Sequence, residues 1–162
     1  MSAGDRAQTK CLKNLLFIYN TESKYDQAIR DFNKVIELDP DSAYAYNNRG
    51  NSYNAKGNPD HAISDCSKAI ELNPNDTGVW SAKGMALNML KRYEEAFVAW
   101  DTVTKLAPKN AAAWYAKSAT LYDLGRYRET ILALKSLEDI SDNGLDSKAW
   151  QLKARAENRV KD

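Results

Sequence analysis

A repeat with a period of 34 residues constrains this chain more than any other feature. Three prolines mark it at Pro40, Pro74 and Pro108, and they close the similar phrases VIELDP, AIELNP and VTKLAP. Agreement at many positions with one fixed period is not expected by chance, so we interpret the chain as an array of similar units. The other matching series are Ala28, Ala62, Ala96 and Thr130; Tyr25, Pro59, Tyr93 and Tyr127; Gly50, Gly84 and Ser118; and Tyr46, Trp80 and Trp114.

Each unit is expected to contain two helices. In the second unit Tyr46, Gly50 and Tyr53 have helical spacing, and the segment KGNP at 56–59 interrupts the pattern before a second helical stripe begins. Small residues such as Ala62 let the paired helices approach closely. We expect the large aromatic side chains to fill the space between helices as core, rather than to form a ligand platform. These side chains are Phe32, Tyr46, Trp80, Trp100 and Trp114.

The pattern W-x2-L-G-x2-Y…A-x3-F…P at this period is the signature of the tetratricopeptide repeat, and the chain resembles that family. The resemblance covers roughly 136 of the 162 residues. It implies an all-α fold, a right-handed superhelical solenoid of helix-turn-helix repeats with a C-terminal capping helix. The predicted parts are a leader at 1–8, four repeats at 9–42, 43–76, 77–110 and 111–144, and the capping helix at 145–162.

Departures from the family pattern are modest. The leucine position holds Arg49 and Lys83, and Asp142 stands where the earlier repeats close with proline. The final segment keeps the aromatic-then-small spacing at Trp150 and Ala154 after a two-residue slip. Many of its other positions are charged, which is what a solenoid needs in order to end without exposing its core.

Composition narrows the class of protein. Acidic and basic residues nearly cancel, leaving a net charge of +1, which disfavours a dedicated nucleic-acid binder. No apolar run approaches the roughly 20 residues that cross a bilayer, and the start lacks the pattern of a secretory signal. Cys11 and Cys66 stand apart with no partner pattern, so we expect free thiols in a reducing compartment. We therefore expect a cytoplasmic protein with neither nucleic acid nor membrane as a partner.

The sequence offers little for catalysis. The single histidine, His61, falls on the outer side of a second helix, where we expect it to be solvated. Cys66 takes the place of a large apolar residue in the other repeats, so we interpret it as buried. Zinc-type cysteine or histidine spacings are absent from the sequence, as are glycine loops that cradle phosphate. We therefore predict that the protein is not an enzyme and holds no metal or cofactor.

Asparagine, a poor helix former, is unusually common within residues 45–58. Tyr44, Asn47, Asn51 and Asn54 lie on one helical face, turned by about a third of a circle from the core stripe. The family resemblance implies that first helices line a concave face, so this stripe would look into it. An amide can donate to and accept from a peptide group of an extended ligand, and we expect these amides to have no structural role. The alternative is that they are merely solvated.

Corresponding positions and their neighbours complete the predicted peptide-binding set. We expect the tyrosines of the fourth repeat to lie across the groove from the asparagines, because they occupy the same positions in the repeat. The predicted residues are Lys13, Phe17, Asn20, Tyr44, Asn47, Asn48, Asn51, Asn54, Met85, Asn88, Tyr115 and Tyr122.

Some members of the family carry a carboxylate clamp for the acidic tails of heat-shock chaperones, and this chain does not fit that pattern. Lys13 and Asn48 match two positions, but Phe17 replaces an asparagine, and Gly78 and Ala82 stand where two cations are needed. The favoured function is a protein–protein interaction module that binds an extended peptide or a helix of another protein in its concave groove. The alternatives are a structural or assembly protein that associates through its array ends, and the repeat arm of a larger protein.

Overall fold

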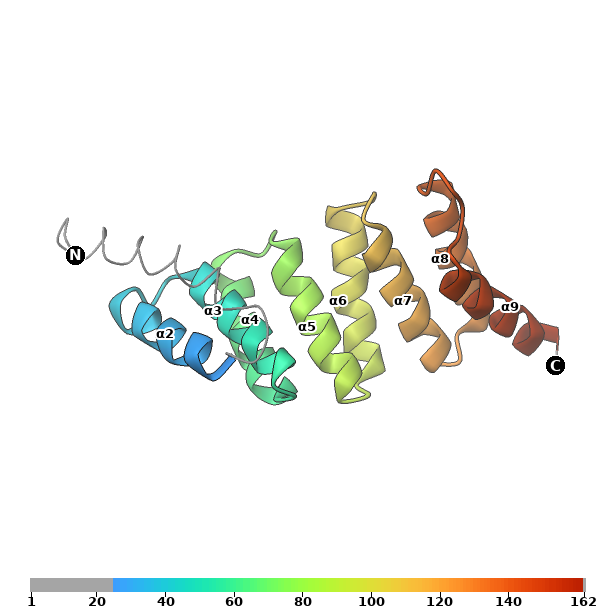
Figure 1. The fold of residues 1–162 in the computed structure, drawn as a ribbon. Helices are drawn as coiled ribbons and strands as arrows, with labels where there is room; N and C mark the ends of the chain where they lie inside the picture. The colour runs from blue at the N-terminus through green and yellow to red at the C-terminus, as the bar shows by residue number, and fades with distance from the viewer. Residues whose placement is uncertain (1–24, 162) are drawn as a thin grey trace. The chain divides into compact units, whose positions relative to one another are not determined.

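The computed structural model describes residues 25–161, and all regular structure in that range is α-helical, which confirms the predicted fold class (Figure 1). The chain divides into two compact units, one ending at Ala86 and the other beginning at Leu87, within α5. The leader, Cys11 and the candidates Lys13, Phe17 and Asn20 lie outside the described residues. The helices are α2 (Tyr25–Leu38), α3 (Ala43–Ala55), α4 (Pro59–Leu72), α5 (Thr77–Met89), α6 (Tyr93–Leu106), α7 (Ala111–Asp123), α8 (Tyr127–Asp139) and α9 (Ser147–Lys161).

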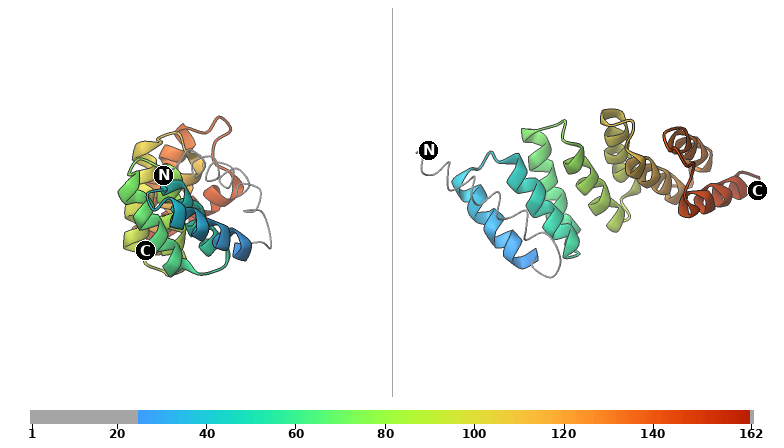
Figure 2. Two further views of the ribbon diagram at one scale, coloured as in Figure 1. Left: turned by 90° about the vertical axis from the view of Figure 1, so that its left-hand side faces the viewer. Right: turned by 45° about the horizontal axis from the view of Figure 1, so that its top comes forward.

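Helices that follow one another along the chain pack side by side within each unit. In the first unit α2 packs on α3, and α3 on α4; in the second, α6 packs on α7, α7 on α8, and α8 on α9. The right-hand view of Figure 2 shows these neighbours within each unit from another direction. Among the helices of residues 25–161, none has both the length and the apolar character needed to span a bilayer.

A residue in the left-handed conformation follows the first helix of three successive helix pairs. Gly57 and Gly125 have φ values of 76° and 74°, which glycine adopts without steric cost. Lys91 stands at the same repeat position with a φ of 58°. That conformation costs a residue with a Cβ roughly 1–2 kcal/mol, so the packing of the helix pair imposes the turn at this site.

In the first unit α3 and α4 approach each other closely at Gly50. A Cβ on Gly50 would lie 3.2 Å from Cys66 Sγ and 3.3 Å from the carbonyl oxygen of Ala62. Ala62 is fully buried there, as the sequence predicted, and so is Ala96 in the second unit. Other fully buried residues of the first unit include Ala28, Phe32, Val35, Ala45, Ala69 and Val79.

The core of the second unit includes an apolar cluster formed by α8, α9 and their connection. Its buried members are Leu134, Leu137, Leu145, Ala149 and Leu152. Partly buried side chains of α7 pack against this cluster. The last helix is therefore held by apolar contacts on one side, while much of its other surface is exposed and charged.

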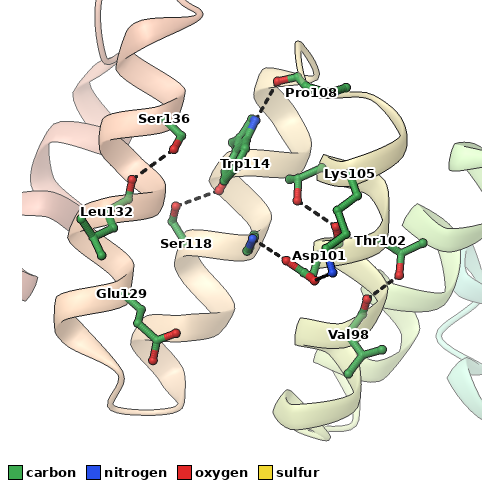
Figure 3. Close-up of polar contacts among 12 residues, drawn as sticks. Val98, Asp101, Thr102, Lys105, Pro108, Trp114, Ser118, Glu129, Leu132 and Ser136 are labelled. Atoms are coloured by element: carbon green, nitrogen blue, oxygen red, sulfur yellow. Dashed lines mark hydrogen bonds and ion pairs between the residues drawn. The ribbon is translucent and has the colours of Figure 1, made fainter.

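The prediction that the large aromatic side chains form the core is confirmed for Phe32 and Trp100, and Tyr46 and Trp114 pack against the edge of core clusters. Tyr46, Trp80 and Trp114 are half-buried, whereas Phe32 and Trp100 are buried. The indole nitrogens explain the position of the two tryptophans. Nε1 of Trp80 donates to the carbonyl oxygen of Pro74 at 2.8 Å. Nε1 of Trp114 donates to that of Pro108, also at 2.8 Å (Figure 3). Each tryptophan thus fastens its helix to the loop that precedes it.

Candidate functional site

Asparagines of α3 lie against α5 in the first unit. Asn54 Nδ2 donates to the carbonyl oxygen of Ala82 at 2.9 Å. Asn47 Nδ2 lies near Gly78, where it would be 3.7 Å from a Cβ on that glycine. The predicted stripe therefore runs along the seam between the first helices of two successive repeats.

The expectation that these amides have no structural role is wrong for Asn54 and for Asn88, one period later. Asn88 Nδ2 lies 3.0 Å from Thr120 Oγ1, and that hydroxyl lies 3.2 Å from Asn88 Oδ1. Each amide is placed at the end of a first helix where it reaches the first helix of the next repeat. Asn48 acts within its own helix, because its Nδ2 donates to the carbonyl oxygen of Tyr44 at 2.7 Å.

Two amides of α3 keep hydrogen-bonding groups to spare. Asn51 Nδ2 donates to Asn47 Oδ1 at 3.1 Å. Within residues 25–161, Asn47 Nδ2 and Asn51 Oδ1 have no hydrogen-bond partner. The side chains of Tyr44 and Met85 are exposed, at 40% and 46%. We call Tyr44, Asn47, Asn51 and Met85 the amide surface.

The two tyrosine candidates belong to the second unit. Tyr115 and Tyr122 of α7 are half-buried and pack against the apolar cluster of α8 and α9. The ring of Tyr122 is also contacted by Arg155, whose Cζ lies 4.8 Å from the ring centroid, and by Tyr127 at 5.2 Å. The ring of Tyr122 is thus largely engaged in contacts within the chain, whereas the side chain of Tyr115 lines a pocket.

A series of cations with a common structural role was missed by the sequence interpretation. Arg49, Lys83 and Lys117 recur at 34 residues, and Lys153 follows after the slip. Each lies over the aromatic ring three residues earlier, a favourable placement for a cation. The distances to the ring centroids are 5.5 Å for Arg49 on Tyr46, 5.9 Å for Lys83 on Trp80, 4.8 Å for Lys117 on Trp114 and 5.2 Å for Lys153 on Trp150.

The same cations also bridge helices, because each reaches a polar side chain on the second helix of the preceding repeat. This is the position at which the family pattern has leucine, so a polar bridge replaces an apolar contact. An aromatic residue followed three positions later by a cation, at the repeat period, was the signal available in the sequence. The bridges are Arg49 to Asn33 at 2.7 Å, Lys83 to Ser67 at 3.0 Å, Lys117 to Asp101 at 2.6 Å and Lys153 to Glu138 at 3.0 Å.

Two of these bridges carry additional charge pairing. Arg49 also binds Asp65 with nitrogen–oxygen distances of 2.6 and 2.8 Å, and this hydrogen bonding raises the pKa of Arg49 despite its partial burial. Asp101 faces α7 from α6 and also binds Lys105 at 2.7 Å (Figure 3). The cation series therefore holds neighbouring helices together.

Neither residue weighed for catalysis has a reactive setting. Cys66 is buried, and burial, with a smaller effect of Asp65, raises the pKa of its thiol to about 12. The thiol therefore stays protonated at neutral pH and is a poor nucleophile. His61 is exposed as predicted, and its ring stacks on Tyr53 at 4.9 Å. Across residues 25–161, histidine, cysteine and acidic side chains form no cluster suited to a metal ion.

Helices that recur in pairs at one period, and that pack on their chain neighbours within each compact unit, define a helical repeat protein. Family models described as tetratricopeptide repeat match residues 43–76 and 66–97, and one described as TPR repeat matches residues 18–57. The chain belongs to the tetratricopeptide repeat family. No curated protein gives a significant match to its sequence.

Solved structures share this fold at low sequence identity. MamA 41-end from Desulfovibrio magneticus RS-1 is 19% identical, with a TM-score of 0.85, over 95% of this chain and 86% of that one. The structure described as "YrrB: a TPR protein with an unusual peptide-binding site" is 17% identical, with a TM-score of 0.82, over 93% of this chain and 76% of that one. Tetratricopeptide repeat proteins are in general non-catalytic interaction scaffolds, and membership of this family supports a role as a protein-interaction module.

Proposed function

We propose that the chain binds an extended peptide segment or a helix of a partner protein, and that the amide surface contacts it. The observation that carries this proposal is the Asn47–Asn51 pair. Its internal hydrogen bond orients both amides and leaves the Asn47 Nδ2 group as an unused donor and Asn51 Oδ1 as an unused acceptor. A peptide group offers the complementary carbonyl and N–H, so the pair can bind the backbone of a ligand whatever its side chains.

The surroundings of this pair favour an uncharged stretch of ligand. Tyr44 and Met85 offer aromatic and flexible apolar contact area on either side of the seam. Gly78 and Ala82 provide no cation from α5, and Ala82 is buried. A terminal carboxylate would have no charge partner from these positions, so we do not propose a chaperone tail as the ligand.

Two further parts of the proposal rest on the family and the sequence. The protein acts as a non-catalytic scaffold in the cytoplasm, without nucleic acid or membrane as a partner. One similar structure is described as a peptide-binding TPR protein, which supports a peptide as the ligand class.

The test is selection of peptides on the purified chain from a random library, followed by affinity measurements by fluorescence anisotropy. Replacing both Asn47 and Asn51 with alanine should weaken binding about fivefold or more for each lost hydrogen bond. The matched control is Asn158→Ala, an exposed asparagine on α9. Equal affinity of the double variant and the wild type would refute a role for the amide surface.

Self-association is a second candidate, favoured by two exposed apolar side chains in the second unit. Val98 of α6 and Leu132 of α8 are 58% and 64% exposed and stand one repeat period apart (Figure 3). Light scattering over a range of concentrations tests this candidate. A dimer that dissociates when both residues are changed to serine would support it, and a monomer at all concentrations would remove it.

A further inference from the structure

The connection between α8 and α9 differs from the other connections between repeats. Residues 140–146 join these helices, whereas four residues suffice at 39–42, 73–76 and 107–110. Asp142 stands where the earlier repeats have proline, and Gly144 has a φ of 72°. This longer segment accounts for the two-residue slip in the sequence and gives the end of the array a different local shape.

A pocket of about 300 Å³ lies beside this connection, inside the second unit. A volume of this size is at the lower end of the range for small-ligand sites. The first turns of α7, the end of α8 and the connection itself form its wall. Its lining includes Ala112, Tyr115, Leu137, Ser141, Leu145 and Asp146.

The lining is apolar, and Asp146 is its one charged side chain. The hydroxyl of Ser141 is already used, because it donates to the carbonyl oxygen of Leu137 at 2.7 Å. Asp146 Oδ1 accepts from the backbone N–H of Ala149 at 2.8 Å, which leaves its Oδ2 without a hydrogen-bond partner among residues 25–161. The pocket thus combines an apolar wall with one exposed carboxylate.

The residues around the connection add further negative charge near the carboxylate of Asp146. Residues 136–147 contain four acidic side chains and no lysine or arginine, and Lys135 and Lys148 stand directly outside this range. Glu138 is paired with Lys153 at 3.0 Å. Within the described part of the chain, no cation forms an ion pair with Asp139, Asp142 or Asp146. The complement of such a surface is a cationic ligand.

The pocket also lies on the face of the first helix that we predict, from the repeat positions, to contact the ligand. Ala112 and Tyr115 of α7 occupy the repeat positions that Tyr44 and Asn47 occupy on α3. A segment that follows these positions along a first helix would therefore pass the mouth of the pocket. This correspondence makes the bound partner, rather than a separate small molecule, the expected occupant.

We propose that this pocket receives one large aliphatic or aromatic side chain of the bound peptide, with a lysine or arginine next to it that pairs with Asp146. The inference rests on the proposed peptide-binding function and adds an anchor and a charge preference to it. Burial of the apolar side chain supplies affinity. The exposed carboxylate selects the flanking charge more than it adds affinity.

The experiment titrates the isotope-labelled full chain with short acetylated peptides and measures the NMR shifts of the chain's amides. Each peptide carries a central three-residue segment between glycine–serine flanks. The peptide with a central lysine–leucine–lysine should shift the amides of Gly144 and Leu145. It should bind about tenfold or more tightly than lysine–alanine–lysine, the smallest factor expected for burying a leucine side chain. It should also bind more tightly than glutamate–leucine–glutamate.

Two variants test the pocket against matched controls. Ala112→Phe fills it from an exposed position and should abolish the leucine preference, whereas Ala154→Phe, an exposed alanine on α9, should leave that preference unchanged. Asp146→Asn keeps an acceptor for the N–H of Ala149 but removes the charge. It should keep the preference for leucine and lose the preference for lysine over glutamate.

The outcomes separate this inference from the proposed function. If the peptides bind and shift the Asn47 and Asn51 amides, but Ala112→Phe has no effect, the pocket proposal is wrong and the amide surface stands. Absence of any shift at Gly144 and Leu145 with all three peptides overturns the pocket as an anchor site. A wild-type dimer that Ala112→Phe converts to a monomer also overturns it, because the pocket would then serve a second copy of the chain.

Discussion

The side-chain amide of Asn54 binds the main chain of Ala82: Nδ2 lies 2.9 Å from the carbonyl oxygen. This contact joins α3 to α5, the first helices of two successive repeats. Asn51 lies one turn earlier on the same helix, and in the described residues its amide pairs with Asn47 alone. Two asparagines of one stripe thus differ: Asn54 joins two first helices, and Asn51 keeps an unused acceptor for the ligand that we propose.

Alanine substitutions should separate these two roles. Asn54→Ala should be less stable than Asn51→Ala by about 0.5–1 kcal/mol, because it alone loses a hydrogen bond between helices. The gain in helix propensity is the same in both variants and cancels in the comparison. Urea unfolding of the two variants measures the difference. Equal stability would mean that the Asn54–Ala82 hydrogen bond contributes nothing.

The two lysines that bind Asp101 should differ in their contribution to stability. Lys117 is 14% exposed and joins α7 to α6, whereas Lys105 is 74% exposed and lies on the same helix as Asp101. Lys117→Met should lower the free energy of unfolding by about 1–2 kcal/mol, the usual cost of losing a partly buried charged hydrogen bond. Lys105→Met should cost less than about 0.5 kcal/mol. Thermal unfolding of both variants in low salt tests this, and a larger loss for Lys105→Met would contradict the bridging role.

Acid should weaken the α6–α7 contact through Asp101. Burial raises the pKa of this carboxyl, but hydrogen bonds from Lys105 and Lys117 together outweigh burial and hold the pKa below its ordinary value. A carboxyl with a lowered pKa in the folded state adds stability above the unfolded pKa, near 4, and loses it as pH falls through the folded pKa. Asp101→Asn should therefore show a shallower loss of stability than the wild type below about pH 4. Parallel curves in urea unfolding across this pH range would contradict the prediction.

Relief of the left-handed turn at Lys91 should stabilise the protein. Lys91→Gly removes a conformational cost of roughly 1–2 kcal/mol and adds back roughly 0.5–1 kcal/mol of unfolded-chain entropy, for a net gain of about 0.5–1 kcal/mol. Lys91→Ala is the matched control, because it removes the same charge but keeps a Cβ in the strained conformation. The midpoint of urea unfolding should rise for the glycine variant alone. An equal rise in both variants would assign the effect to charge.

Local periodicity was enough to predict the fold class and the helix crossings of this protein. Small residues recur at the repeat period, Gly50 with Gly84 and Ala62 with Ala96, and only small side chains allow helices to approach as closely as they do at Gly50. Burial of Cys66 and exposure of His61 followed from the same phase. These properties depend on helical geometry and on residue size, which are both visible in the letters.

The roles of the polar side chains were decided by tertiary structure. Asn51 and Asn54 have the same chemistry and share a helical face, but only Asn54 reaches a main-chain acceptor on the next helix. Lys83 looked like a departure from the leucine of the family, yet it bridges Trp80 and Ser67. The partner of a polar side chain lies many residues away, so the distance and direction between helices decide whether a hydrogen bond forms.

The pocket beside residues 140–146 shows the same division. The sequence by itself determined that the repeat slips there by two residues and loses its closing proline. Only the tertiary structure decided that Tyr115, Leu145 and Asp146 surround a hollow, because a cavity is the volume that packed helices leave unfilled. Periodicity reports which residues face the core, but it carries no information about how completely the core is filled.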